Sequence, residues 1–131
     1  VQGRYEEAGK HLSATSIWRL IMTGKNHLPD NENTLFDAGG GLTRKVGAYN
    51  NNAMVVEVHF ETGTVAARHH HPHEQITYVI SGKFEFTVGD ETYVVSAGDS
   101  LYKQPNIEHG ATCLEAGTLL DIFTPHREDF L

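Results

Sequence analysis

Histidines crowd one short stretch of this sequence. Four of the nine histidines in the 131-residue chain lie within residues 69–73, which read HHHPH. Side chains of an extended strand alternate between its two faces, so residues two apart point the same way. By this rule His69, His71 and Gln75 face one side together, whereas Glu74 faces the other. Imidazole nitrogens and an amide oxygen form a ligand set that suits a borderline divalent metal ion.

A fourth ligand is available from a distant part of the chain. His109 follows a predicted strand and a Pro105-Asn106 turn, from which its ring can close the site. We therefore predict one divalent metal ion held by His69, His71, Gln75 and His109, with nickel, manganese, zinc, cobalt and iron all compatible with these donors. The alternative is that the histidine run is a solvated polar turn, and composition leaves both interpretations open.

The rest of the chain must supply the frame for these side chains. From Leu35 onward, short apolar segments alternate with turn residues such as Thr62-Gly63 and Gly89-Asp90. The predicted strands are 43–48, 54–61, 75–81, 83–88, 91–96, 100–103, 110–114 and 118–124. Many short strands separated by Gly and Asp turns are typical of an all-β sandwich or barrel. Residues 1–34 have only weak helical periodicity and a turn-rich end, so we predict an N-terminal arm there and one β domain over 35–131.

Charge and length narrow the function classes. The chain has ten Lys and Arg against seventeen Asp and Glu, for a net charge of −7. Nucleic-acid binding needs a basic face, so we expect no nucleic-acid partner. No apolar run approaches the roughly 20 residues of a membrane span, so no membrane partner is expected either. The single cysteine, Cys113, favours a reducing compartment, and we expect a cytoplasmic protein.

The last predicted strand carries a second group of reactive side chains. Asp121 lies between Leu120 and Ile122, and a carboxylate in so apolar a stretch must find a partner or a wet pocket. Asp121 and Phe123 share a parity, and Arg127 follows shortly after. If that parity faces inward, an acid, an aromatic wall and a guanidinium converge on the metal site. An Asp121–Arg127 ion pair that only fastens the C-terminus is the alternative.

The two histidine segments resemble the paired motifs of the cupins. Residues 63–82 read GTVAARHHHPHEQITYVISG and match the first motif at Gly63, His69, His71 and Gly82, with Gln75 at the place of its glutamate. Residues 98–109 read GDSLYKQPNIEH and match the second motif at Gly98, Asp99, Pro105 and His109, although its second glycine is absent. The resemblance implies a single-domain cupin, a jelly-roll β-barrel preceded by the short arm.

Three longer segments narrow the resemblance further. HPHEQITYVISGKFEF, AGDSLYKQPNIEHGA and LLDIFTPHREDFL together look like the KdgF-type cupins of pectin and alginate breakdown. In that family the glutamine belongs to the metal site, so Gln75 becomes a match. The implied activity is conversion of 4,5-unsaturated monouronates to linear 5-keto-4-deoxyuronate by ring opening and ketonisation, an isomerase-like, metal-dependent reaction. Asp121, Phe123 and Arg127 would correspond to the acid, aromatic and arginine of that family.

These residues suit the implied chemistry. Arg127 can bind a carboxylate through a two-pronged pair, Asp121 can move a proton, and Phe123 can wall off water. The neutral Gln75 leaves the metal charge uncompensated, which favours an anionic or enolic oxygen and fits less well with two-His-one-carboxylate iron oxygenases. Two alternatives remain, a metal-dependent cupin dioxygenase and a non-catalytic cupin that binds a sugar acid.

One face of the predicted barrel lacks cover. Ile76, Tyr78 and Ile80 alternate with the ligand-facing residues and so lie on the opposite side of their strand. An apolar outer face requires cover by the arm or by another subunit, and symmetric dimers are the commonest oligomers. We therefore expect a homodimer that binds a small-molecule uronate.

Overall fold

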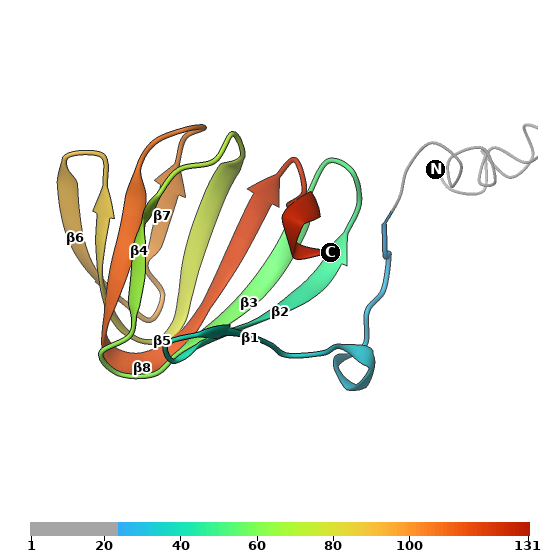
Figure 1. Ribbon diagram of the computed structural model, residues 1–131, viewed down its shortest axis with the longest axis horizontal. Helices are drawn as coiled ribbons and strands as arrows, with labels where there is room; N and C mark the ends of the chain where they lie inside the picture. Colours follow the sequence, from blue (N-terminus) through green and yellow to red (C-terminus); the bar gives the residue numbers. More distant parts are fainter. Residues whose placement is uncertain (1–23) are drawn as a thin grey trace, which may run out of the picture.

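Two long antiparallel strands, β5 and β8, run through the whole fold. The computed structural model describes residues 24–131, so the predicted arm lies outside the described residues except for its last part. The elements are η1 (Asp30–Glu32), β1 (Phe36–Gly39), β2 (Leu42–Tyr49), β3 (Met54–Phe60), β4 (Val65–His69), β5 (Glu74–Val88), β6 (Glu91–Ser96), β7 (Ser100–Lys103), β8 (His109–Thr124) and η2 (Glu128–Phe130) (Figure 1). The predicted all-β fold is confirmed.

β5 and β8 bend together near their middles. The sequence predicts turns at Ser81-Gly82 and Ala116-Gly117, and this prediction is wrong, because both strands continue through these residues with shifts in register. Gly82 has a φ of +86°, and a Cβ placed on Gly117 would lie only 2.0 Å from the carbonyl oxygen of Ser81. The glycines therefore mark a close approach of two backbones at a bend, where a glycine serves as readily as it does in a chain reversal.

The bend divides one continuous sheet into two facing layers. The first half of β5 and the second half of β8 pair with each other and continue through β3, β2 and β1 on one side and β7 on the other. The remaining halves of β5 and β8 are flanked by β6 and β4. Figure 1 shows β4 and β6 at the left, β2 and β3 at the right, and the bend at the bottom.

The sequence analysis did not predict two edge strands, β1 and β4. β1 reads FDAG and β4 reads VAARH, so both lack the apolar alternation that reveals a strand, and their side chains are mostly exposed. Within residues 24–131, each pairs with one neighbour only, β1 with β2 and β4 with β8. Short, polar strands are common at sheet edges, because they discourage pairing with other chains. β4 matters for function, since it ends at His69.

The core lies between the two layers. Its buried side chains alternate along the strands, as on β3, where Met54, Val56, Val58 and Phe60 face inward, and they join a cluster that includes Phe84, Cys113 and Leu119. Cys113 is a free thiol. On β5 the inward residues Gln75 and Thr77 are buried, while Ile76, Tyr78 and Ile80 are about half exposed on the outer face, as predicted.

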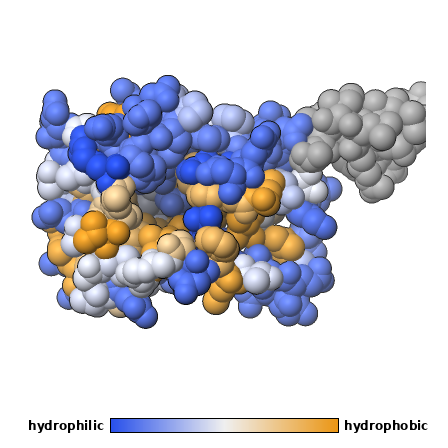
Figure 2. Space-filling model, viewed as in Figure 1, coloured by the Kyte–Doolittle hydropathy of each residue, from blue (hydrophilic) through white to orange (hydrophobic). Residues whose placement is uncertain are grey.

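The surface is mixed in character. On the face drawn in Figure 2, hydrophilic residues dominate the upper part, and hydrophobic residues gather below them around a hollow. Among residues 24–131, no helix is both long and apolar enough to cross a bilayer. The described end of the arm lies beside β2, where the backbones of Lys25 and Tyr49 exchange hydrogen bonds of 2.7 and 3.1 Å.

Candidate metal centre and cavity

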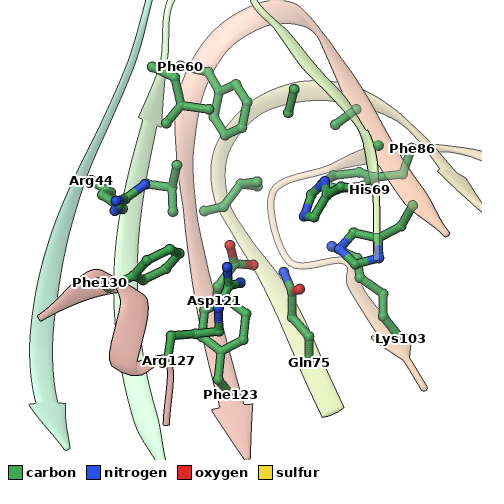
Figure 3. A pocket seen from close by; sticks show the side chains of 17 residues that line it. Arg44, Phe60, His69, Gln75, Phe86, Lys103, Asp121, Phe123, Arg127 and Phe130 are labelled. Atoms are coloured by element: carbon green, nitrogen blue, oxygen red, sulfur yellow. The ribbon is translucent and has the colours of Figure 1, made fainter. Parts of the chain in front are cut away.

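A cavity of about 220 Å³ opens between the two layers (Figure 3). Pockets for drug-sized ligands usually have about 300–1,000 Å³, so this one suits a molecule the size of a single sugar. Its lining is largely apolar, with polar side chains at a few positions, namely Arg44, His69, Gln75, Lys103, His109, Asp121 and Arg127. All the residues predicted to be functional line this cavity except His71, which is buried against two of them, His109 and Phe123.

Three imidazoles converge at one end of the cavity. One nitrogen from each of His69, His71 and His109 lies within 4.8 Å of the others. The prediction that these histidines share one extended strand with Gln75 is wrong, because β4 ends at His69, a loop follows, and Gln75 is the second residue of β5. His69 is the register partner of His109 at the start of β8, and His71 is held in the β4–β5 loop by a hydrogen bond from Asn106 N to its carbonyl. Since metal–nitrogen bonds are about 2.0–2.1 Å long, a small inward movement would place all three around one ion.

Backbone contacts fix which nitrogen faces the centre. His69 Nδ1 lies 2.8 Å from the carbonyl oxygen of Ala67, and His109 Nδ1 lies 2.9 Å from that of Ile107. A carbonyl only accepts, so Nδ1 carries the proton in both rings and Nε2 keeps its lone pair for a ligand. His109 Nε2 is buried and has no partner among the described residues. Such an orphaned atom is rare in native proteins, and a metal ion would satisfy it.

Gln75 completes the predicted set. Its Oε1 lies 2.9 Å from Nε2 of His71, and its Nε2 lies 3.4 Å from the hydroxyl of Thr77. Thr77 thus holds the amide with its oxygen toward the histidines. The residues present fit a divalent ion, with three imidazole nitrogens and one amide oxygen gathered from β4, β5, β8 and one loop. Their role as ligands stays a prediction.

Burial prepares the histidines for metal binding. It lowers the pKa of His109 to about 3, with Lys103 and the neighbouring histidines acting in the same direction. Burial also lowers the pKa of His71 below its usual value. Both rings are therefore neutral at pH 7, which is the state that binds a metal.

A chain of hydrogen bonds crosses the middle of the cavity. Asp121 Oδ1 accepts a 2.6 Å hydrogen bond from the hydroxyl of Thr77, and that hydroxyl accepts a 2.8 Å bond from Nζ of Lys103. Lys103 is 2% exposed, lies 4.3 Å from the ring centroid of Phe86, and has its pKa lowered by burial to about 8. The sequence analysis expected a partner or a wet pocket for Asp121, and its partner is the buried hydroxyl of Thr77, which is bonded in turn to the buried ammonium of Lys103.

Arg127 binds a different carboxylate from the one considered in the sequence. Its Nε and Nη2 donate hydrogen bonds of 3.0 and 2.8 Å to the two oxygens of Asp129. No Asp121–Arg127 ion pair exists in the part of the chain that the structure describes, so that alternative is wrong. The Arg127 guanidinium also lies 5.0 Å from the ring of Phe123 and 4.2 Å from that of Phe130.

Two cavity residues were missed from the sequence, Arg44 and Lys103. Arg44 lies on β2 between the inward-facing Leu42 and Val46, and Lys103 shares the inward parity of Leu101 on β7. A charged residue two positions from an inward-facing apolar residue was the available signal in both strands. With them, the cavity lining holds three cations and one carboxylate, although the whole chain has a net charge of −7. The cavity is therefore suited to an anion.

Comparisons with known proteins agree with this geometry. The family model described as Cupin domain matches residues 56–123. The pectin degradation protein KdgF of Dickeya dadantii is 36% identical over 109 residues, which are 82% of this chain and 99% of that protein.

Two solved structures share both fold and sequence. An RmlC-like cupin from Shewanella frigidimarina superposes with a TM-score of 0.78 at 36% identity, covering 82% of this chain and 96% of the other. KdgF from a Halomonas species superposes with a TM-score of 0.76 at 35% identity, covering 83% of this chain and all of the other. This chain is therefore a cupin, and within the cupins it belongs to the family of the pectin degradation protein KdgF.

Proposed function

We propose that the protein is a metal-dependent enzyme that converts 4,5-unsaturated monouronates, the products of pectin or alginate lyases, to linear 5-keto-4-deoxyuronate. The observation that carries this proposal is one sugar-sized cavity in which a cluster of metal-ligand side chains, a single carboxylate and an excess of cations meet. The relationship to a protein named for pectin degradation supports a substrate from that source.

The metal would be held by His69, His71, Gln75 and His109. A divalent ion bound there would supply a Lewis acid that stabilises negative charge developing on a substrate oxygen. Gln75 contributes no charge of its own, so it does not neutralise the ion.

The substrate carboxylate needs a cation in this acidic protein. The cations that line the cavity, Arg44, Lys103 and Arg127, can provide it through charge-assisted hydrogen bonds. Phe123, which is 2% exposed and lines the cavity beside Asp121, forms an apolar wall against the sugar ring. An apolar wall excludes water and strengthens the electrostatic contacts within the cavity.

The proposed reaction moves one proton and opens one ring. The proton leaves the C1 hydroxyl, the C1 carbonyl forms, and the bond from C1 to the ring oxygen breaks to leave an enolate at C5. Ketonisation then adds a proton at C4 and forms the C5 carbonyl, so the whole reaction is an isomerisation. Asp121 is the single carboxylate among the cavity-lining residues, and Thr77 holds it in place. We assign to it both the removal of the O1 proton and the delivery of a proton to C4.

The activity can be tested directly. The purified protein is mixed with a 4,5-unsaturated monouronate, and loss of the conjugated double bond is followed by ultraviolet absorbance against the spontaneous rate. We expect a rate well above background that a chelator abolishes and added metal restores. Asp121→Asn should lower kcat by about 100- to 10,000-fold while it keeps the metal.

Other outcomes would redirect the assignment. A metal-loaded protein with only the background rate would contradict the proposal. Oxygen uptake under those conditions would favour the dioxygenase, and affinity for a sugar acid without turnover would favour a binding protein.

We further propose that two copies of the chain pair through the outer face of β5, β7 and β8. There Ile76 is the register neighbour of both Ile122 and Tyr102, and the three side chains are 44%, 39% and 55% exposed. Burial of such a patch favours association. Light scattering should give twice the chain mass, and Ile76→Asp should reduce it to the mass of one chain. A monomeric parent protein would contradict the proposal.

A cytoplasmic location fits the free thiol of Cys113.

A further inference from the structure

Arg44 is a charged side chain on the inward face of β2. Its strand neighbours of the same parity, Leu42 and Val46, pack against the core, and its register partner on β3, Val58, is 7% exposed. Arginine is rarely found on such a face without a partner or a function. Arg44 itself is half-buried and lines the cavity.

Among residues 24–131, no carboxylate lies within ion-pair distance of the Arg44 guanidinium, although the charge of Asp129 acts on it from farther away. None of the ion pairs or side-chain hydrogen bonds of the described residues involves it. It lies instead over two aromatic rings, 3.9 Å from the centroid of Phe130 and 4.5 Å from that of Phe36. Stacking uses the flat faces of a guanidinium and leaves the N–H groups at its edge free to bind an anion.

Arg127 differs from Arg44 in this respect. Its Nε and Nη2 already donate to Asp129, in the two-pronged geometry that an external carboxylate would need. Its guanidinium lies 4.2 Å from the ring centroid of Phe130, and Figure 3 shows that ring between the two arginine side chains. Of the two arginines, Arg44 is the one whose side-chain donors are all unengaged among the described residues, including its Nε–Nη edge.

The cavity has opposite ends of different chemistry. Figure 3 shows Arg44 and Phe130 on one side, His69 and Lys103 on the other, and Asp121 and Gln75 between them. A small acid bound with its carboxylate at the Arg44 end would therefore present its ring to Asp121 and its far oxygens to the histidines.

We propose that Arg44 binds the carboxylate of the ligand through two N–H groups at the edge of its guanidinium, while the ring of Phe130 stacks on the guanidinium and holds it in place. This inference rests on the proposed function for the identity of the substrate, and it assigns to Arg44 the selection of acids over neutral sugars. Arg127, paired with Asp129, then supports Phe130 and Phe123 rather than making the main contact.

Turnover provides the first test. In the metal-loaded protein, Arg44→Gln should raise KM for the unsaturated monouronate by roughly 10- to 100-fold with a much smaller change in kcat. Arg44→Lys, which keeps the charge but loses the fork, should give an intermediate KM. Lys83→Gln removes a cation from an exposed position outside the cavity and serves as the matched control. Metal content and thermal unfolding should be unchanged in all three variants.

Binding provides a second test that does not depend on turnover. Calorimetry with galacturonate, a saturated monouronate, and with galactose, its neutral counterpart, should show binding of the acid alone, and Arg44→Gln should abolish it. Arg44-dependent binding without any turnover would refute the proposed reaction and leave the role of Arg44 intact. Equal galacturonate affinity in Arg44→Gln and the parent protein, or no uronate affinity in either, would overturn the inference.

Discussion

The hydroxyl of Thr77 donates a 2.6 Å hydrogen bond to Oδ1 of Asp121, its register partner across the β5–β8 pair. Thr77 is fully buried and also accepts from Lys103, so its single proton is committed to Asp121. The carboxylate is thus oriented by a group that cannot turn away. A threonine within a motif strand, which composition suggests is only a β-former, is the residue that positions the proposed acid.

Removing this hydroxyl should lower activity without unfolding the protein. Thr77→Val keeps the shape of the side chain but leaves Asp121 and Lys103 without their shared partner. Because hydrogen bonds to charged groups contribute about 1.5–3 kcal/mol, we expect kcat to fall by roughly 10- to 100-fold. Thr77→Ser should retain most of the activity. Steady-state kinetics of the two variants would decide, and equal kcat values in Thr77→Val and the parent would contradict a positioning role.

The metal site offers a matched pair of histidine variants. His109→Ala removes a buried ring whose Nε2 has no other partner among the described residues, and it should abolish bound metal. His70→Ala removes an exposed ring of the opposite parity from the same histidine run, and its metal content should be unchanged. Elemental analysis of the dialysed proteins measures both. If the two variants retain equal amounts of metal, the assigned ligand set is wrong.

The buried Lys103 should make the protein less stable than it could be. Its pKa falls from the usual 10.5 to about 8 in the folded protein. Near pH 7 the charged lysine therefore lowers the free energy of unfolding by on the order of 3 kcal/mol. The unfolded chain binds this proton more tightly, so the free energy of unfolding should rise between about pH 8 and 10.5.

Lys103→Met tests this balance. In chelator-treated protein the variant should resist urea better than the parent at pH 7, and it should lose the rise in stability at alkaline pH. Its activity should fall, because Thr77 and the cavity lose their cation. A variant less stable than the parent at pH 7 would show that the lysine stabilises the fold instead.

Acid should destabilise the metal-free protein through its buried histidines. The pKa of His109 is lowered to about 3, whereas the unfolded chain takes up this proton near the usual 6.5. The unfolded state therefore binds more protons, and the free energy of unfolding should fall as pH decreases from about 6.5 toward 3. Denaturation curves of chelated protein between pH 7 and 4 measure this slope. His109→Asn should flatten it, and an unchanged slope in that variant would assign the effect to other groups.

The metal-ligand candidates could be predicted because their relationships are local. His69, His71 and Gln75 lie within seven residues of one another, and the motif spacing adds His109, although the first three occupy β4, a loop and β5 and not one extended strand. Parity also grouped Asp121 with Phe123 on one face of β8, and the structure shows that this face lines the cavity. Asp121 and Phe123 are two residues apart on one strand, so their shared face is visible in the chain itself.

Contacts between distant strands could not be predicted in this way. Phe130 meets Arg44 across 86 positions of sequence, and Thr77 meets Asp121 across 44. Glycines could not be interpreted from the sequence either, because a glycine within a bent strand, such as Gly82 or Gly117, looks the same in the sequence as a glycine in a turn. Sequence patterns therefore predicted the fold class, which is confirmed, and a set of candidate ligands, while the partners of Asp121 and Arg127 could be found only from the strand pairing.

The shared bend of β5 and β8 has a consequence for the geometry of the cavity. Both walls belong to the same two strands, and Gln75 lies on one wall and His109 on the other. The angle between the walls is set by the bend at which the backbones of Gly82 and Gly117 come into close contact. Because both strands bend at the same place, a change in the bend would move the two walls relative to each other. The spacing of the metal ligands thus depends on two residues that have no side chains and lie outside the cavity lining.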